Sequence, residues 1–301
     1  MKQIADELKK AGIEKVWTDE PLANHTTWRI GGPADLLIQP KDKASLKTAL
    51  QILHRHEVPW NVIGRGSNLL VRDGGIRGAV LKVAEGLSHC EFKGEEVCVG
   101  AGYSMIRLAV ETGKMGLTGM EFAGGIPGTV GGAVYMNAGA HGSDLSRILI
   151  EAEILFENGE CKVLTNEELS FSYRTSLLQR QKGIVLEARF QLRAGDRKEI
   201  ATTLAANKDR RRQTQPLQMP CAGSVFRNPP GDHAGRLIEA AGLKGYRIGG
   251  AQVSEKHSNF IVNCGGATAT DVLTLINHVR STILEKNGVD LHPEVLVVGE
   301  G

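Results

Sequence analysis

The chain has 301 residues, of which 41% are hydrophobic and 23% charged, a composition that excludes disordered and fibrous classes and leaves room for two domains. Thirty-six basic residues against 34 acidic ones leave a net charge of +2, which excludes a broad electrostatic surface for nucleic acid. The five scattered cysteines form no C-x-x-C pair, so we expect reduced thiols, a cytoplasmic protein and no metal site.

Taken in chain order, the predicted elements mix helices and strands. Residues 1–10 predict a short amphipathic helix that lacks the apolar core of a signal peptide. Leu46, Leu50 and Leu53 stand at helical spacing in a helix expected over 44–56. A second helix is expected to begin at 104 and to end at Gly113. Strands are expected at 60–64, 78–83, 97–101, 148–156 and 184–192.

The pattern changes near residue 195. A polar helix is expected from about 196 to 212, before Pro216. Later elements are helices over 233–241 and 270–286 and strands over 258–263 and 294–299. We therefore predict a first domain over residues 1–195, with a core of about 25–193, and a smaller α+β domain over residues 196–301.

Glycine is concentrated in two segments. The first glycine segment runs from Gly64 to Gly75, and the second, with seven glycines, lies between residues 124 and 142. Because glycine loses conformational entropy on folding, this density suits a backbone that needs positive φ angles or that approaches a ligand directly. Successive backbone N–H groups also form anion-binding nests, so the segments predict a large, flat, phosphate-bearing ligand, with ordinary connecting loops as the alternative.

Two other interpretations of these segments fit less well. Residues 122–143 carry no charge, as a membrane span would, but seven glycines and a proline argue against a spanning helix. The dinucleotide-binding fingerprint of a Rossmann turn also fails. Leu69 stands where its third glycine belongs, and Pro127 interrupts the other segment. The phosphate interpretation therefore rests on nest geometry, to which Arg65 and Ser67 would add donors.

A third segment, residues 220–230, reads PCAGSVFRNPP. It resembles the proton-donor motif of the UDP-N-acetylenolpyruvoylglucosamine reductase family, the MurB flavoenzymes. The two glycine segments, residues 172–176 (SYRTS) and residues 292–295 (HPEV) agree with that family in the same order. The resemblance therefore runs from about residue 25 to the C-terminus.

The resemblance implies an α+β protein in which an FAD-binding domain of the PCMH, or vanillyl-alcohol-oxidase, type precedes a smaller α+β substrate-binding domain. In that family NADPH reduces a non-covalent FAD, whose N5 passes hydride to UDP-N-acetylenolpyruvoylglucosamine, giving UDP-N-acetylmuramate for peptidoglycan precursors. We expect a monomer with no nucleic-acid or membrane partner. The positions matching the flavin-binding segments are Gly64, Arg65, Gly66, Ser67, Asn68, Gly124, Gly125, Ile126, Pro127, Gly128, Gly131, Gly132, Asn137, Gly139 and Ala140.

Three matched residues would carry the chemistry. Hydride addition builds charge beside the substrate carboxylate, and Arg174 suits it because a guanidinium holds a carboxylate through parallel hydrogen bonds; a structural ion pair is the alternative. Ser224 would supply the proton, since an alcohol can protonate a carbanion-like centre; a turn serine after Gly223 is the alternative. Glu294 would fit near the same carboxylate only if protonated or bridged, and a surface acid is its alternative.

The remaining candidates carry less information. The positions matching the family's substrate site are Tyr173, Asn228 and Gln252, with Tyr246, Arg247 and Lys256 as looser candidates. Cys221 is interpreted as a small buried thiol and the basic run over 207–212 as a solvated helix end. The chain departs from some relatives at Leu296, where they have arginine, and it has no room for the lid of the family's longer class.

Two other functions stay open from the residues. An FAD oxidase of the same superfamily would not need Ser224, and its reduced flavin would reoxidise quickly in air. A nucleotide-sugar-binding module without turnover would bind a UDP-sugar and remain colourless.

Overall fold

The computed structural model describes residues 1–301 and divides into two compact units. Unit 1 comprises Met1–Thr18, Leu36–Arg65 and Gly78–Arg210. Unit 2 comprises Asp19–Asp35, Gly66–Arg77 and Arg211–Gly301. The units divide the chain differently from the predicted boundary at 195/196, because the two early segments carry Trp28, Ile30 and Leu70 into the hydrophobic core of unit 2.

The expected mixture of helices and strands is confirmed. The helices are α1 (Lys2–Lys10), α2 (Lys43–Arg55), α3 (Met105–Met115), α4 (Val130–Met136), α5 (Arg197–Thr214), α6 (Ala234–Ala240) and α7 (Ala269–Asn287). None of them is both long enough and apolar enough to cross a membrane. α2, α5, α6 and α7 fall within a few residues of the predicted helices.

The predicted end of α3 at Gly113 is wrong. The helix continues to Met115 and ends at Gly116, whose φ of +76° is the left-handed conformation favoured at a helix C-terminus. Gly113 lies inside the helix, where a Cβ would stand only 3.0 Å from Ile200 and 3.1 Å from Leu204. Its small size therefore serves the packing of α5 against α3 and does not end the helix.

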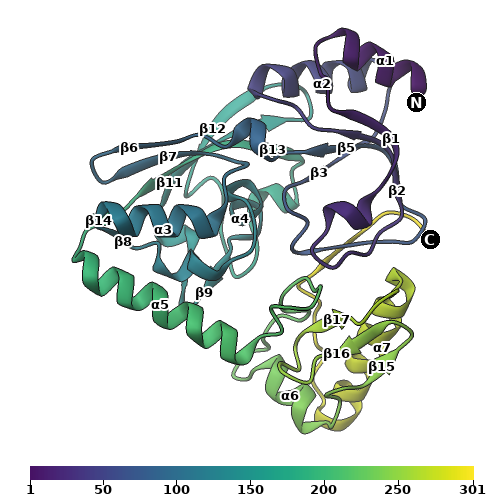
Figure 1. Cartoon of the computed structure of the whole chain (residues 1–301), viewed down its shortest axis with the longest axis vertical. Coiled ribbons are helices and arrows are strands. Elements are labelled where there is room, and N and C mark those ends of the chain that lie inside the picture. The colour runs from purple at the N-terminus through teal and green to yellow at the C-terminus, as the bar shows by residue number, and fades with distance from the viewer. The chain divides into compact units, whose positions relative to one another are not determined.

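A five-stranded antiparallel sheet forms the centre of unit 1, in the order β12-β11-β13-β7-β6 (Figure 1). Its strands are β6 (Cys90–Lys93), β7 (Glu96–Gly100), β11 (Leu149–Phe156), β12 (Cys161–Thr165) and β13 (Gly183–Gln191). Side chains alternate between the core and the outer face of β7, where Val97 and Val99 are buried and Cys98 is half-buried. One face of the sheet is thus apolar and packed, while the other carries polar side chains.

The second sheet has the order β1-β2-β5-β3. Its strands are β1 (Val16–Pro21), β2 (Pro33–Ile38), β3 (Trp60–Ile63) and β5 (Ile76–Lys82). β1, β2 and β5 each contain a boundary between the units, and their unit 1 portions bring Leu36, Ile38 and Leu81 into the core beside α2. α1 lies along α2 (Figure 1), and Glu7 of α1 accepts a hydrogen bond of 2.7 Å from Arg55 of α2.

Short strands complete both units. Unit 1 contains β8 (Leu117–Thr118), β9 (Gly139–Ala140), β10 (Ser143–Asp144) and β14 (Arg193–Ala194). Unit 2 contains β4 (Leu69–Val71), β15 (Arg247–Ile248), β16 (Ala251–Val253), β17 (Ile261–Asn263) and β18 (Leu296–Val298). α7 packs along the small β15-β16-β17 sheet, and β18 pairs in parallel with β4. The first glycine segment, expected to be a loop throughout, therefore contains a strand.

The end of that segment caps α7. The carboxylate of Asp73 accepts hydrogen bonds from the backbone N–H of Ala269 at 2.7 Å and of Thr270 at 2.9 Å, and from the Thr270 hydroxyl at 2.8 Å. Burial alone would raise the pKa of Asp73, but these hydrogen bonds outweigh it and hold that pKa below its ordinary value of 3.8. A negative charge at the start of α7 also complements the helix dipole.

We expect Asp73→Ala to lower the free energy of unfolding by about 1 kcal/mol, the usual cost of losing a helix cap. The folded-state pKa is depressed, so the ionic part of this stability is present above the unfolded-state value near 3.8 and is lost as pH falls through the lower folded-state value. Urea unfolding at pH 7 and pH 3 measures both effects. Asp6→Ala on the exposed face of α1 is the control, and an equal loss in both variants would contradict the capping role.

Candidate active site

Gly64 and the second glycine segment meet within unit 1. A Cβ on Gly64 would stand 2.4 Å from the hydroxyl oxygen of Thr129, so only glycine allows this approach. Thr129 is itself the N-cap of α4, where its hydroxyl accepts from the Gly132 N–H at 3.4 Å. The structure therefore brings together two segments that lie far apart in the sequence.

The glycines of the second segment are needed for close contacts with neighbouring atoms more than for unusual backbone angles. Positive φ between residues 124 and 142 is found at Asn137, His141 and Gly142, and at no other residue of that stretch. At Gly139, a Cβ would stand 2.4 Å from the Ser143 carbonyl oxygen, across the β9–β10 pair. Gly124, Gly125, Ile126, Pro127 and Gly128 are all partly exposed, so this stretch presents accessible main chain that glycine leaves largely uncovered.

Asn137 is a structural residue in this segment. It is 2% exposed, has a φ of +42° and follows α4. Its side-chain nitrogen donates to the Ser172 carbonyl at 3.0 Å, and its side-chain oxygen accepts from the Ser146 N–H at 3.0 Å. The amide predicted to face the flavin thus binds protein at both ends and ties the glycine segment to the segment that carries Arg174.

Arg174 lies against the second glycine segment. Its φ is +56°, a left-handed conformation that a non-glycine residue rarely adopts. Its guanidinium donates to the Gly139 carbonyl at 2.7 Å and lies 5.0 Å from the centre of the Tyr173 ring. The Gln179 amide donates to the Arg174 carbonyl at 3.0 Å. These contacts fix both the backbone and the head group of Arg174.

Tyr173 was predicted as a site residue from the sequence, whereas Gln179 was not. Tyr173 is 50% exposed, which is unusual for a large aromatic ring and leaves about half of its surface accessible to a ligand. Gln179 also donates to the Tyr135 carbonyl at 3.1 Å, which accepts from the Ser176 hydroxyl as well, at 2.8 Å. A single glutamine in a polar stretch carries no periodic signal, so only the folded structure identifies this role.

In unit 2, main-chain hydrogen bonds bring Ser224 and Glu294 onto neighbouring segments. The Glu294 N–H donates to the carbonyl of Val225, the residue after Ser224, at 2.7 Å. Phe226 and Pro293 form an isolated β-bridge beside it. The Asn68 amide, from the first glycine segment, donates to the Glu294 carbonyl at 3.2 Å. Three predicted site residues are thus assembled here.

Asn259 holds the Ser224 segment in place and was not predicted as a site residue. It is 4% exposed, and its side-chain oxygen accepts from the Phe226 N–H at 2.9 Å while its nitrogen donates to the Phe226 carbonyl at 2.8 Å. Its own carbonyl accepts from the Val225 N–H at 2.8 Å. Gly223, just before Ser224, has a φ of +75°, so the chain turns sharply at the proposed donor.

The other predicted residues of unit 2 are spread among its loops and strands. The Asn228 side chain accepts from the Ala234 N–H at 3.1 Å, at the start of α6. Gln252, in β16, donates to the Gly245 carbonyl at 3.0 Å and accepts from the Cys264 thiol at 3.2 Å. Tyr246 stacks on His278, with ring centres 4.3 Å apart. Arg247 donates to the Gly249 carbonyl, and Lys256 to the Arg212 carbonyl.

Cys221 and Arg211, which belongs to the basic run over 207–212, are both partly buried. Burial raises the pKa of the Cys221 thiol above its ordinary value of 9.0, although Arg211 and the Gly223 N–H oppose this, so the thiol is protonated at neutral pH. Burial also lowers the pKa of the Arg211 guanidinium. The Cys221 carbonyl accepts from the Thr27 hydroxyl at 2.7 Å. Arg211, from the predicted solvated helix end, is half-buried and donates to Gln215 at 2.8 Å. The run is therefore not solvated throughout.

Comparison with known proteins agrees with the class that this architecture indicates. An FAD binding domain model matches residues 34–165, and a model of the UDP-N-acetylenolpyruvoylglucosamine reductase C-terminal domain matches residues 215–298. A crystal structure of the reductase MurB from Thermus caldophilus matches with a TM-score of 0.81 and 39% identity over 94% of this chain and 98% of that one. An alkyldihydroxyacetonephosphate synthase shares the fold over 64% of the chain, with a TM-score of 0.50 and 18% identity.

Full-length relatives make the assignment specific. The chain is 58% identical over 301 residues to UDP-N-acetylenolpyruvoylglucosamine reductase of Bacillus licheniformis, covering 100% of this chain and 99% of that protein. It is 57% identical over 300 residues to the protein of the same name from Bacillus subtilis, covering 99% of each. The two domains define an FAD-dependent oxidoreductase. The chain belongs to the UDP-N-acetylenolpyruvoylglucosamine reductase, or MurB, family.

We expect Asn137→Ala to lower the free energy of unfolding by about 2 to 3 kcal/mol, because two buried hydrogen bonds are lost and alanine is strained at positive φ. Asn137→Gly loses the same hydrogen bonds without the strain, and so it should cost less. Chemical denaturation of the two variants checks this order. Equal stability of both variants and the parent would show that the amide does not tie the two segments together.

Proposed function

We propose that this protein reduces UDP-N-acetylenolpyruvoylglucosamine to UDP-N-acetylmuramate for peptidoglycan precursor synthesis, with NADPH as reductant and a non-covalent FAD as cofactor. The observation that carries the proposal is the 58% identity, over the whole chain, to a reductase of that name. The positions of Arg174 against the glycine segment and of Ser224 beside Glu294 support it.

The residues of unit 1 fit a flavin. The accessible main chain at 124–128, with glycine at three of its five positions, leaves room for a planar ligand to approach closely, and the N–H groups of its glycines suit a pyrophosphate. We therefore assign Gly64, Arg65 and residues 124–140 to FAD binding, and Gly66, Ser67 and Asn68 of unit 2 as further contacts. When bound, FAD would supply the hydride that NADPH donates. We therefore assign FAD binding to the predicted first domain, residues 1–195, which would also supply Arg174 and Tyr173 to the substrate. The other substrate contacts would come from the predicted second domain, residues 196–301.

Arg174 would bind the enolpyruvyl carboxylate and oppose the negative charge that builds beside it. Its guanidinium is already oriented by the Gly139 carbonyl and the Tyr173 ring, so little reorganisation is needed as charge develops. Tyr173, half exposed next to it, would contact the same substrate. Asn228 and Gln252 would contribute polar contacts from unit 2.

Ser224 would deliver the proton that completes the reduction. It follows Gly223 in a sharp turn and precedes a segment whose main chain is fixed by hydrogen bonds to Asn259 and Glu294, so the backbone that carries the hydroxyl is held in place. A fixed alcohol can protonate a strongly basic carbon at which it is aimed. Glu294 would lie near the same centre, protonated or bridged by water or a cation, because a bare carboxylate would oppose the developing anion.

We expect Arg174→Lys to reduce kcat by about 100-fold, since a point charge replaces a planar fork at the site of developing charge. Flavin content should change little, because the glycine segments are untouched. Steady-state kinetics and the visible absorbance of the purified variant measure the two effects separately. Loss of flavin together with activity would make Arg174 a structural residue.

The sharpest test is Ser224→Ala. Reduction of the flavin by NADPH needs no proton from Ser224, whereas completing the reduction of the enol ether does. Stopped-flow absorbance should therefore show flavin bleaching by NADPH at a near-normal rate. Reoxidation by UDP-N-acetylenolpyruvoylglucosamine should be slower by about 100- to 10,000-fold, the range for a lost general acid.

Ser224→Cys is the matched control, because a thiol can still donate a proton and should recover part of the rate. Equal damage to both half-reactions would indicate a disturbed flavin site. Unchanged reoxidation would assign the proton to another group. A parent protein that purifies without flavin and cannot be reconstituted with FAD would overturn the proposed function itself.

A further inference from the structure

Three potential metal ligands meet on the outer face of the five-stranded sheet of unit 1. Glu187 lies on β13, Cys98 on β7 and His89 just before β6. Gly100 pairs directly with Glu187, and its N–H donates to the His89 carbonyl at 3.0 Å. Gly100 therefore stands between Glu187 and His89 in one row across the sheet, and its missing side chain leaves room for theirs to meet.

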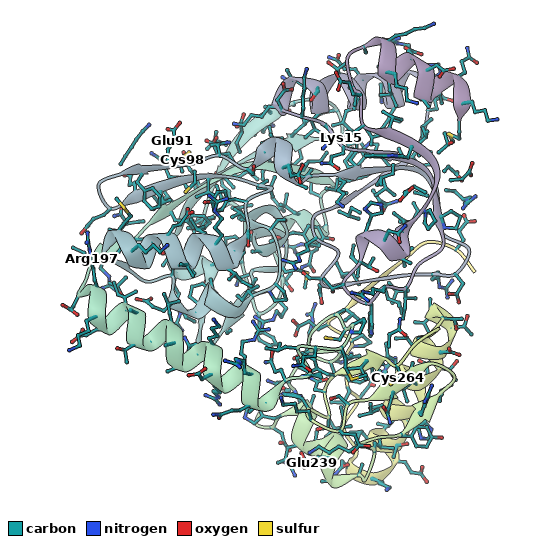
Figure 2. All side chains as sticks on the ribbon, in the orientation of Figure 1. Lys15, Glu91, Cys98, Arg197, Glu239 and Cys264 are labelled. Carbon is teal, nitrogen blue, oxygen red and sulfur yellow. The ribbon has the colours of Figure 1, made fainter.

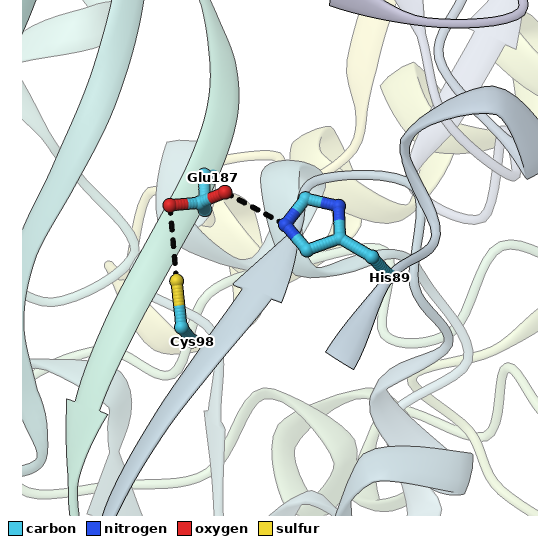
Figure 3. Close-up of side chains that lie close together, drawn as sticks. All are labelled: His89, Cys98 and Glu187. Atoms are coloured by element: carbon cyan, nitrogen blue, oxygen red, sulfur yellow. Dashed lines mark hydrogen bonds and ion pairs between the residues drawn. The ribbon is translucent and has the colours of Figure 1, made fainter. Parts of the chain in front are cut away.

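The side chains of His89 and Cys98 each point to a different oxygen of the Glu187 carboxylate (Figure 3). His89 Nε2 lies 2.7 Å from Glu187 Oε2, and the Cys98 thiol donates to Glu187 Oε1 at 3.0 Å. All the ligand atoms of the cluster lie within 4.8 Å of one another. In a tetrahedral zinc site, bond lengths near 2.0 to 2.3 Å place the donor atoms roughly 3.5 Å apart. Small side-chain rotations would close the cluster around an ion.

The imidazole is also held from its other side. Its Nδ1 lies 2.8 Å from the place where a Cβ on Gly100 would stand, so the ring packs against bare main chain there. Side-chain exposure is 41% for His89 and 27% for Glu187, so an ion in solution can reach the donor atoms. The site is thus both partly preformed and accessible.

The surrounding charges favour a cation. Glu91 pairs with Cys98 across the β6–β7 hairpin, where both are labelled in Figure 2, and Glu153 lies one strand further on. Two cations are near: Arg189 is paired with Glu96 and Glu151, and Lys43 bridges Glu153 and Glu187. When Cys98 is ionised, its thiolate and the nearby carboxylates together outnumber the two cations.

We propose that His89, Cys98 and Glu187 form a site for a divalent ion of the zinc class, with a fourth position open to water. A thiolate, an imidazole and a carboxylate are together the ligand set of zinc and its chemical neighbours, whereas magnesium and calcium prefer oxygen alone. The site is separate from the residues assigned to flavin and substrate.

Binding of the ion would displace protons from its protein ligands. Burial, together with the hydrogen bond to Glu187, raises the pKa of the Cys98 thiol to about 12, so the site holds a thiol at neutral pH. Burial opposes ionisation of Glu187, but hydrogen bonds from Cys98, Lys43 and His89 lower its pKa to about 2, so this ligand is already ionised. The ion would form bonds to Sγ, Nε2 and a carboxylate oxygen. The thiol proton would pass to solvent, and the imidazole would exchange its Nε2 proton for one on Nδ1.

Lys43 supplies a variant with the opposite effect. Its ammonium lies 3.1 Å from Glu187 Oε2 and shares that oxygen with His89. Removing the positive charge frees the carboxylate and ends repulsion with the incoming ion. Lys43→Gln should therefore tighten metal binding by about tenfold, even with the interaction screened by water. A purely structural polar network would not respond in this way.

The experiment is equilibrium dialysis of the full-length purified protein against zinc, with metal measured by elemental analysis. Cobalt difference spectra against the untreated protein then detect a thiolate-to-cobalt absorption. We expect one zinc per chain. Cys98→Ser and His89→Ala should each weaken binding by at least about 100-fold, more than the loss of an outer-sphere partner. Cys161→Ser, at an exposed thiol outside the cluster, should bind zinc like the parent.

The proposal is overturned if the parent binds no zinc at micromolar concentration, or if Cys98→Ser retains the parent's affinity. It is also overturned if cobalt produces no thiolate absorption, or if Lys43→Gln weakens binding. Activity is not part of the readout, so failure here leaves the proposed reductase function untouched.

Discussion

The parallel pairing of β18 with β4 is the contact on which the candidate catalytic residues of unit 2 depend. It joins residues 296–298 to residues 69–71, and the Leu296 N–H continues it by donating to the Asn68 carbonyl at 3.0 Å. Two residues before β18, the Glu294 N–H donates to the carbonyl of Val225, the residue after Ser224. The bonds are main chain to main chain, so the position of Ser224 does not depend on the side chain at 296. Leucine there is compatible with the fold.

In unit 1 the corresponding constraint is a strained residue. A non-glycine residue in the left-handed region costs of order 1 to 3 kcal/mol and persists only where its surroundings fix it. Arg174 meets that condition, since Gln179 binds its carbonyl and Gly139 accepts from its guanidinium. Asn137, also left-handed, ties the Arg174 segment to α4. These hydrogen bonds hold the guanidinium in a defined direction, as the proposed electrostatic role of Arg174 would require.

The five-stranded sheet of unit 1 has one apolar and one polar face because side chains alternate along a strand. On β13, Leu186 and Ala188 enter the core, while Glu187 and Arg189 remain on the polar face. The apolar face packs against α4, which lies within the second glycine segment. The polar face gathers His89, Cys98 and Glu187 across three neighbouring strands. A change of register by one residue would exchange these faces, so folding of the core also fixes the polar cluster.

Elements with a strong local pattern could be predicted from the sequence. The leucine spacing of α2, the apolar alternation of β11 and β13 and the long periodic run of α7 carry their burial in consecutive residues. The glycine segments and the motifs around Arg174 and Ser224 also predicted the reductase family, which the comparisons confirm. The roles of Arg174 and Ser224 stay predictions. Short strands such as β4 were missed, since three residues show no period and their pairing partner lies more than 200 residues away.

Tertiary structure alone decided the rest. Trp28 and Leu70 belong to the core of unit 2 although they precede most of unit 1, Gly113 packs α5 and does not end α3, and Asn137 and Asn259 bind main chain. Positions 89, 98 and 187 have no common motif, so their convergence was invisible beforehand. All of these features have the same physical reason. Local periodicity records which face of an element is buried, whereas the partner of that face is set by contacts between residues distant in the chain.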